Sequence, residues 1–276
     1  MQASLEAVAD IPVTNLSGES ITLGTMLSVS NSDKHDFVFL SCLSHFGDFN
    51  AWEMTQQYQA ASAIDAKVVL VGIGTVNAAQ QFANDLDLME NNDGNIILLC
   101  DETGAITEAL NCYRGWLAID EQHAQRWPAT DINPYIKLLG MIFGFGSPGT
   151  MSQVLYGYTG DASSDYATRE WVVNALLQGS RKGRWPKLTE EAFANVPKDS
   201  GLRPFELATL RAQTGIHIVW NWKRLGPLNG SLFTRMGGTF VFDKDGSCIY
   251  EYYDQGILTY ANVKEVCRVL ERTESK

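Results

Sequence analysis

The sequence predicts an α/β fold: a sheet flanked by helices, with an N-terminal β-hairpin and a large, mostly helical insertion before the last β-hairpin. Three observations carry this prediction. Apolar runs of strand length alternate with helix-periodic segments over residues 1–116. Residues 235–276 hold two further strand-like runs, a turn and an amphipathic segment. Residues 117–234 are too long for a loop inside a compact domain, so we expect an insertion there.

Composition limits the function classes. A chain of 276 residues that is 45% hydrophobic and 19% charged is expected to fold around a sizeable core. A net charge of −11 argues against general nucleic-acid binding and against attraction to an anionic membrane surface. Five scattered cysteines and four scattered histidines match no disulfide or zinc spacing, so we expect a reducing compartment and no cofactor. Residues 1–12 have no basic run, so no signal peptide is expected.

The first part of the chain predicts a hairpin and then a strand–loop–helix unit. Residues 11–27 are predicted to form the hairpin, with its turn at residues 17–19. Residues 37–43 form a mostly apolar run that is typical of a buried central strand. After a short break at residues 44–47 the period becomes helical, with Asp48 placed as the N-cap.

The remaining elements of the α/β part follow from the same patterns. Parallel strands are expected because each apolar run is followed by a helical segment. The predicted strands are residues 67–73, 95–100, 238–242 and 248–253, and the predicted helices are residues 77–86, capped by Asn77, 105–110 and 262–272.

The loop after the predicted central strand carries a resemblance. Residues 45–53 have the sequence His-Phe-Gly-Asp-Phe-Asn-Ala-Trp-Glu. This resembles the active loop of the AhpC/TSA, peroxiredoxin-like 2 family of the thioredoxin-like superfamily, usually His-Phe-Gly-Cys-Pro-Phe-Cys-Trp/Arg-Glu. Asp48 stands at the first cysteine position and Ala51 at the second. The resemblance implies a thioredoxin-like fold, and a carboxylate cannot supply its thiol chemistry.

Other segments extend the resemblance over nearly the whole chain. Residues 235–243 resemble the Arg-Gly-Thr-Phe-Ile-Ile-Asp stretch of peroxiredoxins, whose arginine supports the reactive thiolate. Arg235 stands two residues further from the strand, and if it keeps that role it would face Asp48. The Ser-Pro-Gly-Thr at residues 147–150 and the Arg-Pro-Phe-Glu-Leu-Ala-Thr-Leu-Arg at residues 203–211 resemble the cyanobacterial and plastid branch.

Several interpretations of these residues stay open. Asp48 could cap the helix, pair with Arg235, or act with His45 as a base or metal ligand. Cys42 or Cys112 could serve as a displaced nucleophile, or pack as small apolar side chains. Arg203, Glu206 and Arg211 are expected to form ion pairs on the long helix of the insertion.

Residues 134–145 form the most apolar segment of the insertion and are too short to span a bilayer. They are interpreted first as a buried helix, and otherwise as an exposed helix that docks on another protein. Helical spacing cannot bury all of their large side chains on one face. We therefore expect interface residues among them: Tyr135, Ile136, Met141, Ile142, Phe143 and Phe145.

The leading hypothesis is a degenerate peroxiredoxin-like protein that acts as a non-catalytic binding or structural subunit. The resemblance implies the photosynthetic machinery as the partner class, and a place in the cyanobacterial cytoplasm or plastid stroma, compatible with thylakoid association. The alternatives are a thiol antioxidant or reductase using Cys42 or Cys112, and a non-redox enzyme recruiting His45, Asp48, Glu53 and Arg235.

Overall fold

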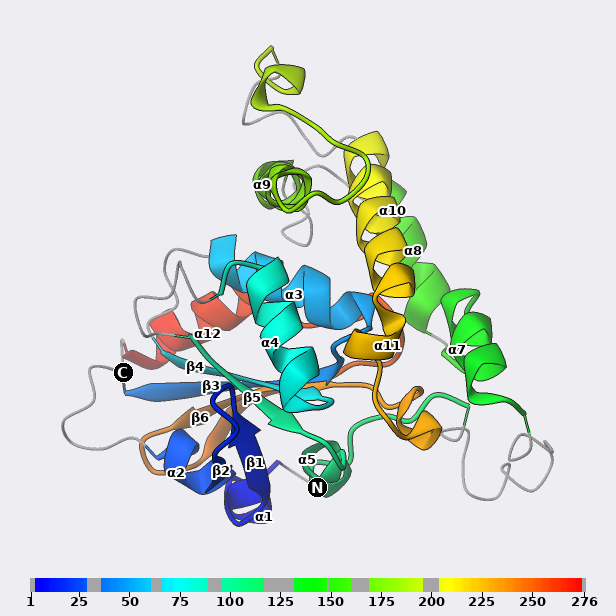
Figure 1. The fold of residues 1–276 in the computed structure, drawn as a ribbon. Helices are drawn as coiled ribbons and strands as arrows, with labels where there is room; N and C mark the ends of the chain where they lie inside the picture. Colours follow the sequence, from blue (N-terminus) through cyan, green and yellow to red (C-terminus); the bar gives the residue numbers. More distant parts are fainter. Residues whose placement is uncertain are drawn as a thin grey trace.

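A computed structural model describes residues 3–28, 36–60, 66–88, 96–116, 132–147, 149–159, 169–195 and 204–274. A mixed sheet lies at the centre, with helices on both of its faces and a group of helices rising beside it (Figure 1). The strand order is β2-β1-β5-β4-β3-β6-β7. The strands are β1 (Pro12–Asn15), β2 (Ser20–Thr22), β3 (Phe37–His45), β4 (Lys67–Ile73), β5 (Ile96–Asp101), β6 (Gly238–Asp243) and β7 (Cys248–Tyr253).

The pairing of the strands defines a thioredoxin-like sheet. The central strand β3 runs parallel to β4 and antiparallel to β6, and β6 forms a hairpin with β7. Strand β5 adds a further parallel strand beyond β4, and the β1–β2 hairpin pairs antiparallel with β5. The helices of this part are α1 (Glu6–Ala9), α2 (Leu23–Leu27), α3 (Phe49–Ala60), α4 (Val76–Asp85), α5 (Ala105–Ala109) and α12 (Val263–Glu274). The predicted fold class is confirmed.

Three predicted boundaries were wrong. The hairpin ends at Thr22, because the following residues form α2 instead of extending the second strand. Strand β3 continues to His45, two residues beyond the predicted end. Helix α4 is capped by Thr75, not Asn77: the Thr75 side chain accepts a hydrogen bond from the N–H of Ala78 at 3.2 Å.

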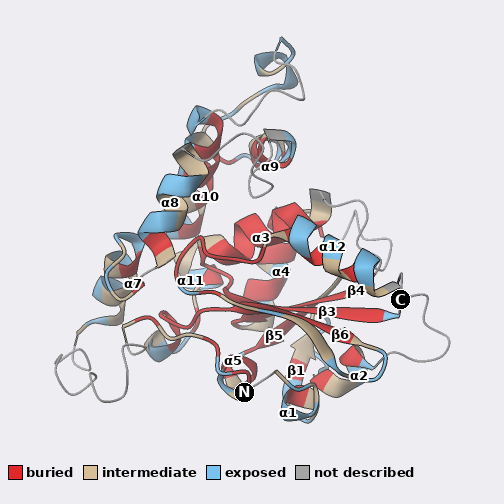
Figure 2. Cartoon of the chain, turned by 180° about the vertical axis from the view of Figure 1, so that it is seen from behind, coloured by how far each residue is buried: buried red, intermediate tan, exposed pale blue. Residues whose placement is uncertain are grey.

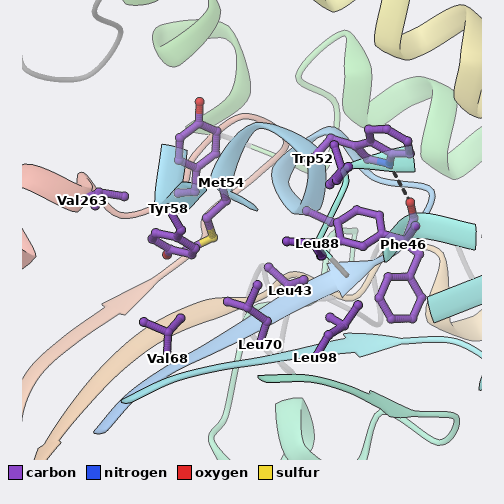
Figure 3. Packing of buried hydrophobic residues seen from close by; sticks show 14 of the residues in the cluster. Leu43, Phe46, Trp52, Met54, Tyr58, Val68, Leu70, Leu88, Leu98 and Val263 are labelled. Atoms are coloured by element: carbon purple, nitrogen blue, oxygen red, sulfur yellow. Dashed lines mark hydrogen bonds between the residues drawn. The ribbon is translucent and has the colours of Figure 1, made fainter. Parts of the chain in front are cut away.

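Strand β3 is buried along its whole length and separates two apolar clusters. Side chains alternate between the two faces of a strand, so Phe39 and Leu43 pack toward α3 and α4 while Leu40 and Cys42 pack on the other face. Figure 3 shows the first cluster, where Leu43, Trp52 and Phe46 pack together and the Trp52 Nε1–H donates to the Phe46 carbonyl at 2.8 Å. This packing holds the β3–α3 loop against the sheet.

The described residues of the predicted insertion form helices and no strand. They are α7 (Pro134–Ile142), α8 (Gly149–Thr159), α9 (Arg169–Arg181), η2 (Glu190–Ala192), α10 (Pro204–Trp220), α11 (Trp222–Leu225) and η3 (Gly230–Leu232). Helices α9 and α10 contact α3, while α7 and α8 lie at the outer edge of the molecule (Figures 1 and 2). Among the described helices, none is long and apolar enough to cross a membrane.

Candidate functional site

The β3–α3 loop is closed by Asp48, which caps α3. The Ser44 hydroxyl donates to Asp48 Oδ2 at 2.6 Å, and the backbone N–H of Asn50 donates to Oδ1 at 3.2 Å. Asp48 is only 4% exposed. Both oxygens of the carboxylate are therefore engaged, one by a hydroxyl and one by an otherwise unpaired N–H of the first helical turn.

Two aromatic side chains cover this loop: Trp222 of α11 and Phe233, the residue that follows η3. The His45 ring lies edge-on to the Trp222 ring, with centroids 5.6 Å apart, and its Nε2 is 3.3 Å from the Phe233 carbonyl oxygen. A Cβ added at Gly47 would lie 3.0 Å from Trp222 Cζ3, so Trp222 rests directly on the loop. Burial lowers the pKa of His45, which keeps the imidazole neutral at physiological pH. The loop is sealed from solvent.

Glu53 forms a buried ion pair that joins the core to the insertion. It accepts from Arg211 on α10 and from the Tyr260 hydroxyl, which lies 2.6 Å from Oε2. Arg211, which was expected to form ion pairs on the long helix, reaches across to Glu53 on α3, and its guanidinium also lies over the Tyr158 ring. Arg203, its predicted companion, lies outside the described residues.

Arg235 does not pair with Asp48, contrary to expectation. Its Nη2 donates to Glu108 Oε2 at 2.9 Å, and Glu108 also pairs with Arg114 at 3.2 Å. Two additional residues separate Arg235 from β6, and they place it in a bridge with Arg114 beside α5. Hydrogen bonding by Arg235 lowers the pKa of Glu108. The geometry therefore does not gather His45, Asp48, Glu53 and Arg235 into one catalytic set.

Asp254, which the sequence did not single out, lies buried close to the capped loop. Its Oδ2 accepts from Asn50 Nδ2 at 3.0 Å, and the same amide group donates to the Gly256 carbonyl at 3.1 Å. Burial raises the pKa of Asp254 well above its usual range, and the nearby Asp48 carboxylate raises it further. The sequence around Asp254 does not indicate that it belongs to this site, because its hydrogen-bond partner Asn50 is far away in the chain.

Cys42 and Cys112 lie together on the far face of the sheet from α3. Both belong to the apolar cluster beneath α1, α2 and α5. Burial raises the pKa of both thiols, so both stay protonated near neutral pH. Ala51, at the second cysteine position of the resemblance, is fully buried in the opposite cluster with Trp52.

The predicted interface residues divide into two groups. Tyr135, Phe143 and Phe145 are 56%, 63% and 65% exposed, and Ile136 and Ile142 are exposed as well. Met141, also expected among the interface residues, meets the core instead. It is 1% exposed and packs in a cluster that includes Met236, Ile257 and Leu258, because it lies on the inner face of α7.

The histidines do not form a metal site in the part of the chain that the structure describes. His217 Nε2 lies 2.7 Å from Asp85 Oδ2 and its ring packs against Trp52, whereas His45 is buried under Trp222. His35 and His123 lie outside the described residues. Among the described side chains, no group of three or more His, Cys, Asp or Glu is arranged to hold a metal ion.

The sheet and the capped β3–α3 loop define a thioredoxin-like protein. The chain belongs to the AhpC/TSA antioxidant enzyme family, whose sequence pattern matches residues 53–256. The match begins after the capped loop, so it does not include Asp48 or Ala51. No curated protein matches the chain. A solved thioredoxin-like protein from Aeropyrum pernix is similar at 18% identity over 40% of this chain and 72% of that chain, with a TM-score of 0.22.

Proposed function

We propose that this chain is a degenerate peroxiredoxin-like protein, without loop thiols, that acts as a non-catalytic binding or structural subunit. The observation that carries the proposal is the state of Asp48. Where the resemblance places the peroxide-reactive thiol, a carboxylate accepts hydrogen bonds from Ser44 and from the Asn50 N–H. Such a group stabilises the helix and has no sulfur to oxidise.

The surroundings of Asp48 support a structural role. A peroxidatic residue must be reached by its substrate, whereas Trp222 and Phe233 pack over this loop. Tyr135 of α7 contacts both of these aromatic residues. Trp222 Nε1 donates to the Tyr135 hydroxyl at 3.3 Å, and the Tyr135 ring packs edge-on to Phe233. Helix α7 of the insertion thereby holds Trp222 and Phe233 over the loop.

The binding role rests on exposed apolar side chains of the insertion, including Tyr135, Phe143 and Phe145. Large aromatic side chains anchor interfaces, and a cluster of them on a surface marks an interaction site. The resemblance implies a complex of the photosynthetic machinery as the partner. It also implies a place in the cyanobacterial cytoplasm or the plastid stroma, with peripheral association with thylakoid membranes.

The test is peroxide consumption followed by stopped-flow. Because no loop thiol exists, the protein should consume peroxide no faster than a free thiol at equal concentration. The matched control is the Asp48→Ser variant, which keeps a capping oxygen and should behave in the same way. Saturable, protein-dependent loss of peroxide would contradict the proposal.

The second candidate is a thiol antioxidant or reductase using Cys42 or Cys112. Two observations favour it: both thiols lie in one cluster, and the charge of Arg235 acts against burial, which raises the pKa of Cys112. Burial opposes this effect and is the larger cause for both thiols. Peroxide loss abolished by Cys42→Ser or Cys112→Ser would establish this candidate instead.

A further inference from the structure

The outer side of the insertion carries an apolar surface on two neighbouring helices. The spacing of three and four residues along α7 places its apolar side chains on one face, opposite the buried Met141. We define the α7–α8 surface by six side chains that are 40–65% exposed: Ile136, Leu139, Ile142, Phe143, Phe145 and Met151.

The α7 and α8 parts of this surface are continuous. Gly144 lies between the two phenylalanines, and a Cβ added to it would come 2.7 Å from Met151 Cγ. Met151 belongs to the first turn of α8, where it is followed by the exposed Leu155 one turn later. In Figure 2 the exposed sides of α7 and α8 face away from the sheet. The surface is therefore one patch and not scattered single residues.

The charge of this segment differs from that of the chain. Residues 133–159 contain a single charged side chain, Lys137, and no acidic residue, although the whole chain has 32 acidic residues and a net charge of −11. A specific protein interface normally has a polar rim that supplies charge complementarity. The two helices offer almost no charges for such a rim. An apolar side with almost no charge suits a lipid interface; Lys137 lies one turn before Met141 and therefore on the side of α7 opposite the apolar one, away from the lipid.

The helices are too short to enter the bilayer as spans. Helix α7 has 9 residues and α8 has 11, about half the length that a membrane-crossing helix needs. Short helices with an exposed apolar face lie at the boundary between headgroups and acyl chains. Helix α7 is also anchored to the rest of the chain, since Trp222 donates to the Tyr135 hydroxyl and Met141 packs in a core cluster.

We propose that the α7–α8 surface inserts into the interface of a lipid bilayer and attaches the protein peripherally to a membrane. The inference rests on the proposed function: it assigns these exposed side chains to the peripheral membrane association, with lipid as what they contact. Insertion is driven by the apolar side chains and not by charge, because the chain as a whole is strongly acidic.

The experiment is flotation of the full chain with phosphatidylcholine vesicles, alone or with phosphatidylglycerol. The wild type should float with phosphatidylcholine, and anionic lipid should not increase the bound fraction. The Phe143→Ser/Phe145→Ser variant should lose roughly tenfold or more in partition coefficient, because two aromatic side chains no longer leave water. The matched control is Phe205→Ser/Leu228→Ser, which removes two large apolar side chains outside the surface that are even more exposed, at 84% each, and should bind as the wild type does.

Three flotation results would overturn the inference. The first is a wild type that does not float, and the second is equal binding by both double variants. The third is binding that appears only with phosphatidylglycerol and disappears in salt, which would indicate electrostatic attachment. Light scattering distinguishes self-association: a wild-type dimer that the Phe143→Ser/Phe145→Ser variant converts to a monomer, without flotation, makes the surface a contact between copies.

A measurement on the wild type alone guards against misfolding of the variant. Hydrogen exchange of α7 and α8 should slow when phosphatidylcholine vesicles are added, with no change in α5. Unchanged exchange in α7 and α8 would overturn the inference. The peroxide assay tests the proposed function independently of this inference. If the protein binds vesicles and also turns over peroxide, the non-catalytic role is wrong and the membrane site still stands.

Discussion

Arg211 on α10 donates to both carboxylate oxygens of Glu53 on α3, with Nε at 2.8 Å from Oε1 and Nη2 at 3.3 Å from Oε2. The two side chains are 8% and 1% exposed. A two-point contact between a guanidinium and a carboxylate fixes orientation as well as distance. This pair therefore sets how the insertion lies against the α/β part of the chain.

The first prediction concerns this pair. Glu53→Gln keeps the size of the side chain but removes the buried carboxylate charge that faces Arg211, which should cost about 3 kcal/mol in the free energy of unfolding. Denaturant unfolding measures it. Glu102→Gln, an exposed change, should cost less than about 0.5 kcal/mol and serves as the control. Equal midpoints for the two variants would show that the pair does not hold the insertion.

The second prediction concerns the cap. Asp48→Ala removes the acceptor for the Asn50 N–H and the Ser44 hydroxyl, and should cost about 1–2 kcal/mol in the free energy of unfolding. Asp48→Asn keeps a side-chain oxygen and should recover most of that loss. A midpoint for Asp48→Ala that matches the wild type would mean that the carboxylate is not needed by the fold.

The third prediction concerns pH. Burial raises the pKa of Asp254, so the folded protein holds a proton that the unfolded chain releases above its ordinary pKa of about 4. The contribution of Asp254 to the stability of the wild type should therefore fall as pH rises from about 4 toward the raised pKa. Asp254→Asn cannot release that proton, so its stability relative to the wild type should increase over the same range.

Urea unfolding at several pH values tests this, with Asp10→Asn as an exposed control that should follow the wild type. A difference between Asp254→Asn and the wild type that stays constant with pH would show that Asp254 titrates normally in the folded protein.

The fourth prediction concerns thiol reactivity. Cys42 and Cys112 are buried with raised pKa values, so alkylation of the native protein should leave both unmodified. Cys267, which is half-buried, should be modified before them. Peptide mapping by mass spectrometry after timed alkylation measures the order. Early modification of Cys42 would favour the thiol enzyme over the non-catalytic subunit.

The sequence predicted the sheet well because its signals are local. Strands β4 and β7 begin and end where apolar and β-branched runs begin and end. The change from β2 to α2 was missed because residues 23–27 are too few to show a helical period. The cap of α4 was assigned to Asn77 because Thr75 and Asn77 are both good capping residues, and only the backbone conformation separates them.

The site was less predictable because its contacts join distant segments. Asp48 was predictable as a cap from its place before a helical period. That Trp222 covers Gly47, and that Arg235 turns to Glu108, depends on how the insertion packs. The inward position of Met141 and the outward position of Phe143 also follow from packing, since sequence spacing alone does not say which face of α7 meets the core.

The β3–β6 pairing has a consequence for folding. Phe37 pairs with Asp243 in the register of the central strand, and the whole insertion lies between them in sequence. One edge of β3 therefore stays unpaired until nearly all of the chain has been synthesised and the long intervening segment has closed into a loop. During that interval a mostly apolar strand presents free backbone groups, so we expect slow folding and a dependence on chaperones that a compact thioredoxin-like domain without the insertion would not share.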